Sequence, residues 1–190
     1  FIVLEDADID LATDELLWGR MYNTGQVCCA SKRFLVHKNV ASEFSKKAVE
    51  KISAIKAGMP SDEDSELGCL ISERAAIKVE DQVNLTVSQG GKVILGGNRN
   101  GAFYDPTVII DVPKTADVAM EIFGPVVPII TFDTIEEAIE IANSSKFGLC
   151  GCVFSQNMKN AFYVANALEC GGSVINGASF FRSFEMPFGG

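Results

Sequence analysis

Two adjacent cysteines near the start of this 190-residue chain are its first candidates for chemistry. Cys28 and Cys29 follow a glycine-containing loop, Asn23-Thr24-Gly25-Gln26, which comes after a segment with helical spacing. Such a loop can hold a thiol in place, and nearby main-chain amides favour the thiolate, which is the nucleophilic form. The alternative is an inert packed thiol, because free cysteine is among the most buried residue types. The local sequence is therefore compatible with either a catalytic nucleophile or a packed, unreactive thiol.

The remaining cysteines give no sign of a metal site. The chain has six cysteines in all but no paired Cys-x-x-Cys motifs, and His37 is its only histidine. Structural zinc sites need closely spaced cysteine and histidine ligands. We therefore expect free thiols and no metal.

Composition and charge narrow the class of protein. The chain is 47% hydrophobic, which suits one folded domain with a sizeable core. Its net charge of -9 includes one dense acidic run at 61–66 and no basic face, so nucleic acid is not an expected partner. No stretch approaches the roughly 20 apolar residues of a membrane span, and no charged leader precedes an apolar run. These features predict a cytoplasmic protein that does not cross a membrane.

Helical and strand-like segments alternate along the chain. Helical spacing of apolar residues, or an N-terminal capping pattern such as Thr134-x-x-Glu137, predicts helices at 13–22, 40–58, 72–89, 135–144 and 158–168. Runs rich in β-branched residues predict strands at 33–37, 92–95, 104–112, 126–131, 149–154 and 173–175. This order favours an α/β fold with three layers, in which helices flank a largely parallel sheet.

A longer string around the cysteines carries a family resemblance. The run from Asn23 through Gln26 and Val27 to Cys28, followed by Arg33-Phe34-Leu35-Val36, resembles the active-site segment of the aldehyde dehydrogenase superfamily. In that pattern the nucleophile is the cysteine two positions after the glutamine. The resemblance therefore assigns catalysis to Cys28 and leaves Cys29 as a packed neighbour.

A second segment is similar to the cofactor-contacting part of the same family. In the run Glu121-Ile122-Phe123-Gly124-Pro125-Val126, the resemblance implies that Glu121 holds the nicotinamide ribose of NAD or NADP and that Phe123 packs near the ring. A carboxylate can accept from a pair of ribose hydroxyls, and Gly124-Pro125 would make a rigid turn. Without the resemblance, Glu121 would be interpreted as a solvated loop charge.

The resemblance extends over nearly the whole chain. Three further runs agree in order: Asn143 to Leu149, Gly171 to Asn176 and Pro187 to Gly190. The opening run, which begins at Phe1, looks like the stretch that follows the family's Glu-Leu-Gly-Gly element. Residues 1–190 are thus expected to be a catalytic domain truncated at both ends. The cofactor domain, the glutamate general base and an oxyanion-hole asparagine would lie outside it, so the isolated chain is expected to be inactive.

The family resemblance also implies a mechanism for the intact enzyme, which would be a homo-oligomer. The Cys28 thiolate attacks an aldehyde carbonyl, and the backbone N–H of Cys28 helps to hold the oxyanion. Hydride transfer to the nicotinamide leaves a thioester, which water cleaves to a carboxylic acid.

The substrate is less well defined by the sequence. Tyr22 and the loop at 178–182, which contains Phe181 and Arg182, occupy positions that line the substrate tunnel in relatives, and Phe188 with Phe181 offers apolar walls. Arg182 could pair with a distal carboxylate, which would suit succinate semialdehyde, because arginine binds planar anions through two parallel hydrogen bonds. The alternative is an exposed loop arginine with no role in binding.

Three other functions remain open at this point. An acylating aldehyde dehydrogenase or acyl phosphate reductase would share the cysteine and the hydride step. A non-catalytic or structural member of the superfamily would keep the fold without a reactive Cys28. A cysteine hydrolase would need a histidine beside the thiol, and His37 lies beyond the intervening strand.

Overall fold

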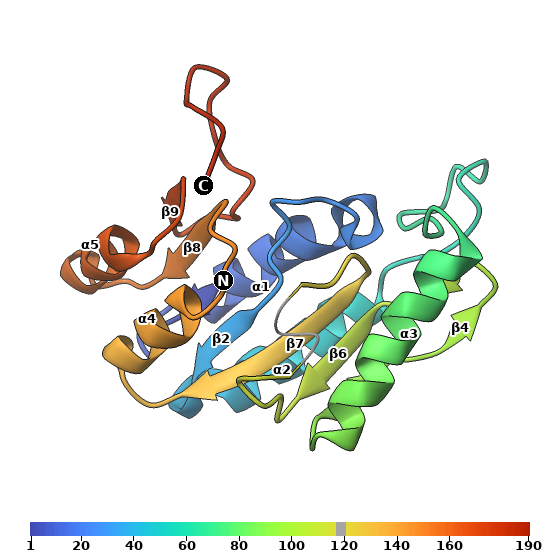
Figure 1. The fold of residues 1–190 in the computed structure, drawn as a ribbon, viewed down its shortest axis with the longest axis horizontal. Helices are drawn as coiled ribbons and strands as arrows, with labels where there is room; N and C mark the ends of the chain where they lie inside the picture. The colour runs from blue at the N-terminus through green and yellow to red at the C-terminus, as the bar shows by residue number, and fades with distance from the viewer. Residues whose placement is uncertain (117–120) are drawn as a thin grey trace.

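The computed structural model describes residues 1–116 and 121–190, and in these residues the strands form a seven-stranded sheet and a small two-stranded one (Figure 1). The order in the large sheet is β3-β6-β7-β2-β1-β8-β9. Its neighbouring strands are parallel except β3 and β6, which are antiparallel. The predicted α/β fold with a largely parallel sheet is confirmed. The strand bounds are β1 Ile2–Val3, β2 Phe34–His37, β3 Lys92–Leu95, β6 Thr107–Ile110, β7 Val126–Phe132, β8 Gly151–Phe154 and β9 Ser173–Ile175.

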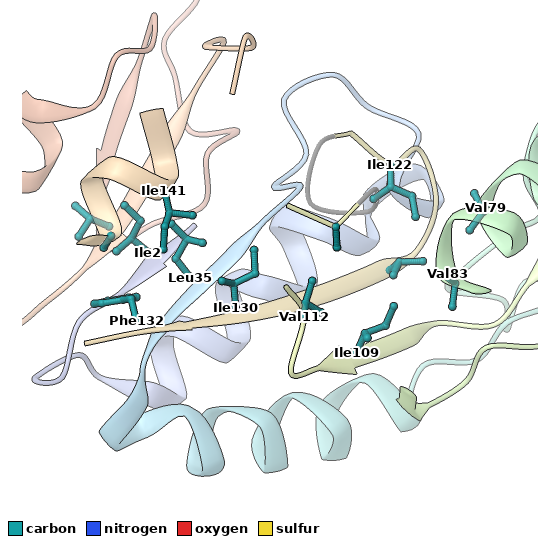
Figure 2. Packing of buried hydrophobic residues seen from close by; sticks show 14 of the residues in the cluster. Ile2, Leu35, Val79, Val83, Ile109, Val112, Ile122, Ile130, Phe132 and Ile141 are labelled. Atoms are coloured by element: carbon teal, nitrogen blue, oxygen red, sulfur yellow. The ribbon is translucent and has the colours of Figure 1, made fainter. Parts of the chain in front are cut away.

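Helices cover both faces of the large sheet, so the molecule has three layers. The helices are α1 (Ile9–Leu16), α2 (Lys38–Ser53), α3 (Glu73–Ser88), α4 (Ile135–Asn143) and α5 (Met158–Ala167). Buried side chains of α1 and α2 share one hydrophobic cluster, whereas those of α3, α4 and α5 share the other, which Figure 2 shows. Successive β2 residues alternate between the clusters, as a strand buried on both faces requires: Phe34 and Val36 join one, Leu35 the other. No helix in the described ranges is long and apolar enough to cross a bilayer.

Side-chain caps set most of the helix starts. Ser72 accepts from the Ala75 amide before α3, and Thr134 accepts from the Glu137 amide before α4, at 3.2 Å in each case. Asn157 caps α5 in the same way. These polar acceptors satisfy amides that the first helical turn leaves unpaired. The predicted helices at 72–89, 135–144 and 158–168 are confirmed within one residue at each end.

Three predicted elements differ from the structure. The helix expected at 40–58 is α2, which begins two residues earlier and ends five residues earlier, at Ser53. The first helix was expected at 13–22, but it starts at Ile9 because Asp8 caps it by accepting from the Leu11 amide. The chain then widens into a π-helical turn, η1 (Leu17–Met21), and continues as a short, tighter 3-10 turn, η2 (Tyr22–Gly25). The expected strand at 104–112 is divided. Its first residues form β5 (Phe103–Tyr104), which pairs with β4 (Arg99–Asn100) in the small sheet, and β6 begins only after Pro106.

The parallel strands bring distant segments to one edge of the sheet. Cys28 precedes β2, Gly124 precedes β7, Gly148 precedes β8 and Gly171 precedes β9. Parallel strands begin at the same edge, so the segments that lead into them meet there. The candidate site therefore lies at the amino ends of the strands, whereas ligands in open α/β sheets usually bind beyond the carboxyl ends.

The packing predicts a large effect for one buried ring. Phe154 is fully buried on β8 and stacks on Phe1 with ring centroids 4.6 Å apart. We expect Phe154→Ala to lower the free energy of unfolding by about 3–5 kcal/mol, because the lost ring leaves a cavity. The control Phe162→Ala, at a ring 54% exposed on α5, should change it by less than about 0.5 kcal/mol. Urea unfolding followed by circular dichroism compares the two, and equal losses would contradict this core assignment.

Candidate active site

The loop before the cysteines has an unusual backbone. Asn23, Thr24 and Gly25 lie in the left-handed region with φ values of 50°, 57° and 72°. This conformation is easy for glycine and tolerated by asparagine, but it is strained for a β-branched threonine. The Thr24 hydroxyl compensates by donating to the Gly68 carbonyl at 3.1 Å, and the Gln26 side chain accepts from the Ile71 amide at 2.8 Å. The loop is thus fixed to the segment that precedes α3.

The two cysteines occupy the centre of a β-turn. The Ala30 amide donates to the Val27 carbonyl at 3.2 Å, which closes the turn around Cys28 and Cys29. Cys28 is exposed and Cys29 is half-buried. The Cys29 carbonyl accepts from the Ser179 hydroxyl at 2.8 Å, and burial raises the pKa of the Cys29 thiol. The geometry thus favours Cys28 over Cys29 as the accessible nucleophile.

Cys28 opens on a pocket of about 120 Å³. That volume is close to the ~150 Å³ of a cavity that can hold benzene, so a small aldehyde fits. Glu121, Lys32, Phe147 and Cys150 also line the pocket. The structure therefore brings the predicted nucleophile and the predicted ribose-binding carboxylate to one hollow.

Lys32 is a neighbour of Cys28 that the sequence analysis did not identify. Its ammonium donates to the Val27 carbonyl at 2.8 Å and lies 3.9 Å from the centre of the Phe123 ring. Burial, followed by the charge of Arg20, lowers the pKa of Lys32 to about 8. Lys32 thus holds one face of the ring that the family resemblance places beside the nicotinamide. The sequence alone gave no indication of this role beyond the position of a basic residue four places after Cys28.

Arg20 is the second residue that the sequence analysis missed. Its side chain is fully buried, and burial lowers its pKa to about 9. The guanidinium donates to the carbonyls of Val126 at 2.7 Å, Ile122 at 2.9 Å and Gly124 at 2.5 Å. A signal was present, because Arg20 follows Leu16 by four residues and so falls on the buried stripe of the predicted helix.

The loop at 121–126 also contacts the nucleophile loop directly. A β-carbon added at Gly25 would collide with the carbonyl of Gly124. The positive φ of Gly25 already favours glycine, and this close approach is a second requirement for it. The two loops that carry the predicted site residues are therefore packed backbone to backbone.

The predicted substrate residues divide into two groups. Tyr22 packs against Trp18 and Phe180, with ring centroids 4.9 Å and 5.8 Å away. Phe181, Arg182 and Phe188 instead line a second hollow of about 60 Å³. Cys29 lines that hollow too, whereas Cys28 does not.

Arg182 is exposed and held by its own loop. Its guanidinium lies 4.6 Å from the centre of the Phe188 ring and donates to the Met186 carbonyl. Both contacts are within a few residues of Arg182. In this arrangement the side chain does not line the Cys28 pocket.

Comparison with known proteins agrees with this geometry. The model of the aldehyde dehydrogenase family matches residues 1–190. The chain belongs to the aldehyde dehydrogenase family, as the sequence motifs predicted.

Two curated relatives and one solved structure illustrate the similarity. A lactaldehyde dehydrogenase of Methanococcus aeolicus is 42% identical over 189 residues, which are 100% of this chain and 41% of that protein. The succinate semialdehyde dehydrogenase Sad of Escherichia coli, named for NAD(P)+, is 41% identical and covers 93% of this chain and 39% of its own length. The glyceraldehyde-3-phosphate dehydrogenase GapN of Methanocaldococcus jannaschii, complexed with NADP, superposes with a TM-score of 0.94 at 38% identity and covers 99% of this chain and 41% of its own. The chain thus spans about two fifths of the length of the relatives it matches.

The different environments of the thiols predict different alkylation profiles. Burial raises the pKa of Cys150 to about 12, and alkylation needs the thiolate. We expect iodoacetamide to label the exposed Cys28 first at about pH 8, while the rate at Cys150 keeps rising toward pH 12. In the unfolded chain the pKa of the Cys150 thiol is about 8.5, which is lower than in the folded chain. The free energy of unfolding that this thiol contributes therefore decreases as the pH rises from about 8.5 to 12. Peptide mapping gives the rate for each cysteine, and faster labelling of Cys150 than Cys28 at pH 8 would contradict the site.

Proposed function

We propose that this chain is the catalytic domain of an NAD(P)-dependent aldehyde dehydrogenase that oxidises an aldehyde to a carboxylic acid through Cys28. The observation that carries the proposal is the shared pocket of exposed Cys28 and Glu121, with Phe123 held beside it by Lys32. Family membership and the names of the relatives support it. These relatives do not favour the acylating, acyl-phosphate or non-catalytic alternatives.

The residues at the pocket fit a nicotinamide cofactor. Phe123 is 41% exposed, so part of its ring is available for stacking, while Lys32 lies over the ring. The Glu121 carboxylate lies at the pocket wall, where it can accept from two ribose hydroxyls. NAD(P)+ would supply the hydride acceptor. Lys32 is close enough to Arg20 for the charge of Arg20 to lower the pKa of Lys32, and the charges of Glu121 and Cys28 act on Lys32 in the opposite direction.

The chemical steps then belong to Cys28 and its turn. The Cys28 thiolate attacks the carbonyl carbon to form a thiohemiacetal, and the oxyanion accepts from the Cys28 backbone N–H. Loss of hydride converts the Cys28 adduct to a thioester. Water then cleaves the thioester, releases the acid and restores the thiol.

The proposal assigns the remaining parts of the reaction to other segments of a longer polypeptide. This chain corresponds to about two fifths of each relative, which leaves room for a dinucleotide-binding domain and for the glutamate that activates water. All six cysteines are unpaired, which suits a reducing cytoplasm. A homo-oligomer is part of the same proposal and rests on the family resemblance.

Turnover tests the role of Cys28. In the full-length enzyme, Cys28→Ser should lower kcat for NAD(P)H formation by at least about a thousandfold, because a hydroxyl lacks an accessible anion near neutral pH. Cys29→Ser is the matched control, and it should keep kcat within about threefold, since Cys29 does not line the Cys28 pocket. Absorbance of the reduced cofactor measures the rate. Full activity in Cys28→Ser would overturn the proposal, and acid formation without cofactor reduction would favour a hydrolase.

Succinate semialdehyde is the proposed substrate, supported by the similarity to the Escherichia coli enzyme. Arg182 would bind its distal carboxylate after leaving the Met186 carbonyl. Arg182→Ala should then lower kcat/KM for succinate semialdehyde about tenfold or more while changing that for butanal by less than about threefold. Steady-state kinetics on both aldehydes compare the losses. Equal losses would remove Arg182 from substrate recognition.

A further inference from the structure

Building on the proposed function, we propose that Arg20 is the positioning residue that fixes the cofactor-contacting loop at 121–126 to the nucleophile segment. Arg20 does not line the Cys28 pocket. It acts through the backbone of the loop that carries Glu121 and Phe123.

The hydrogen bonds of Arg20 are concentrated on this loop. The acceptors are the carbonyls of Ile122, Gly124 and Val126, which are alternate residues of one short run. Ile122 and Gly124 flank Phe123 directly. One planar guanidinium can serve several acceptors in a fixed fork, which a lysine ammonium or an apolar side chain cannot do. The side chain thus fixes the backbone on both sides of the ring.

Burial of the charged Arg20 side chain costs free energy of folding, and packing alone does not account for such a residue. A buried guanidinium loses its hydration, and well-packed apolar residues often replace buried charges without loss of stability. The cost is visible in the lowered pKa of Arg20, and its Nη1 has no hydrogen-bond partner among the described residues. A residue retained for packing alone would not need this charge.

The position of Arg20 in the chain links it to the nucleophile. Arg20 lies in η1, which leads through η2 to Cys28. The Gly25 contact with Gly124 and the Lys32 contact with Phe123 join the same two segments. From other elements, Gln82 of α3 donates to the Glu121 carbonyl at 3.0 Å, and the Thr107 amide of β6 donates to the Pro125 carbonyl at 2.8 Å. Arg20 differs from them because its three hydrogen bonds join this loop to the nucleophile segment itself.

The test uses Arg20→Lys and Arg20→Met in the full-length enzyme. We expect the KM for NAD(P)+ to rise and kcat to fall, with a combined loss in kcat/KM for the cofactor of roughly ten- to a hundredfold, the scale of an approximately 1 Å misplacement. Arg20→Lys keeps the charge but not the fork, so it should show most of the loss. The KM for the aldehyde should change by less than about threefold.

A cofactor-free reaction separates positioning from general damage. Cys28 should be acylated by p-nitrophenyl acetate without any hydride step, and the burst of p-nitrophenol reports that reaction. In both Arg20 variants the burst rate should stay within about threefold of wild type, because Cys28 and its turn remain intact.

Arg99→Lys is the matched control. Arg99 is also a partly buried arginine with several acceptors: it donates to the Glu80 carboxylate at 2.8 Å, the Glu73 carboxylate at 3.1 Å and the Gly101 carbonyl at 3.3 Å. Its replacement should lower the melting temperature as the Arg20 variants do. It should leave the KM for NAD(P)+ unchanged, because Arg99 does not line the Cys28 pocket and none of its acceptors belongs to the loop at 121–126.

The outcomes distinguish the two proposals. If the wild-type enzyme reduces no cofactor with any aldehyde, the proposed function fails. If the wild type is active and the Arg20 variants keep their cofactor KM, or lose the acylation burst to the same extent, the positioning role is wrong. Should the Arg20 variants fail to fold, Gln82→Leu tests the same loop, and an unchanged cofactor KM there would also count against the inference.

Discussion

The parallel alignment of the central strands is the constraint on which the rest of the structure depends. Because β2, β7, β8 and β9 all begin at one edge, four loops that are far apart in the sequence converge there. Burial of both sheet faces fixes the register, since a shift by one residue would exchange the two hydrophobic clusters. The positions of the loops at the edge are therefore a consequence of core packing. Core packing does not fix the exact spacing between those loops. Buried polar contacts such as the Arg20 hydrogen bonds join the loops directly.

A fully buried arginine, Arg20, and a half-buried lysine, Lys32, lie at this edge of the sheet. Burial lowers the pKa values of both Arg20 and Lys32, so each positive charge is held in a region where it interacts strongly with its neighbours. Under the proposed function, a positive charge beside Phe123 would favour reduction of a nicotinamide bound there, because the oxidised ring is positively charged and the reduced ring is neutral. The Lys32 contact with Phe123 would then assist hydride transfer.

The sequence predicted elements whose signals are local. Ser72 and Thr134 mark helix starts because a cap is a contact between residues three apart, and the β-rich run at 126–131 is long enough to be recognised. Strand β1 escaped prediction because it has two residues and depends on its neighbours β2 and β8. Arg20 escaped because its acceptors lie more than 100 residues further along the chain. The division of Tyr22 from Arg182 likewise depends on how the loop after β9 folds, which no local pattern specifies.

The choice between the two adjacent cysteines shows what the structure adds to a motif. The family resemblance selects Cys28 by its distance from Gln26, without a physical reason. The turn supplies one, because only Cys28 of its two central residues lines the main pocket. The Cys29 carbonyl accepts from Ser179 and Cys150, and burial raises the pKa of the Cys29 thiol. A thiol with a raised pKa and no access to the pocket is poorly suited to attack an aldehyde there. The assignment of Cys28 thus rests on the geometry of the turn as well as on the spacing of a motif.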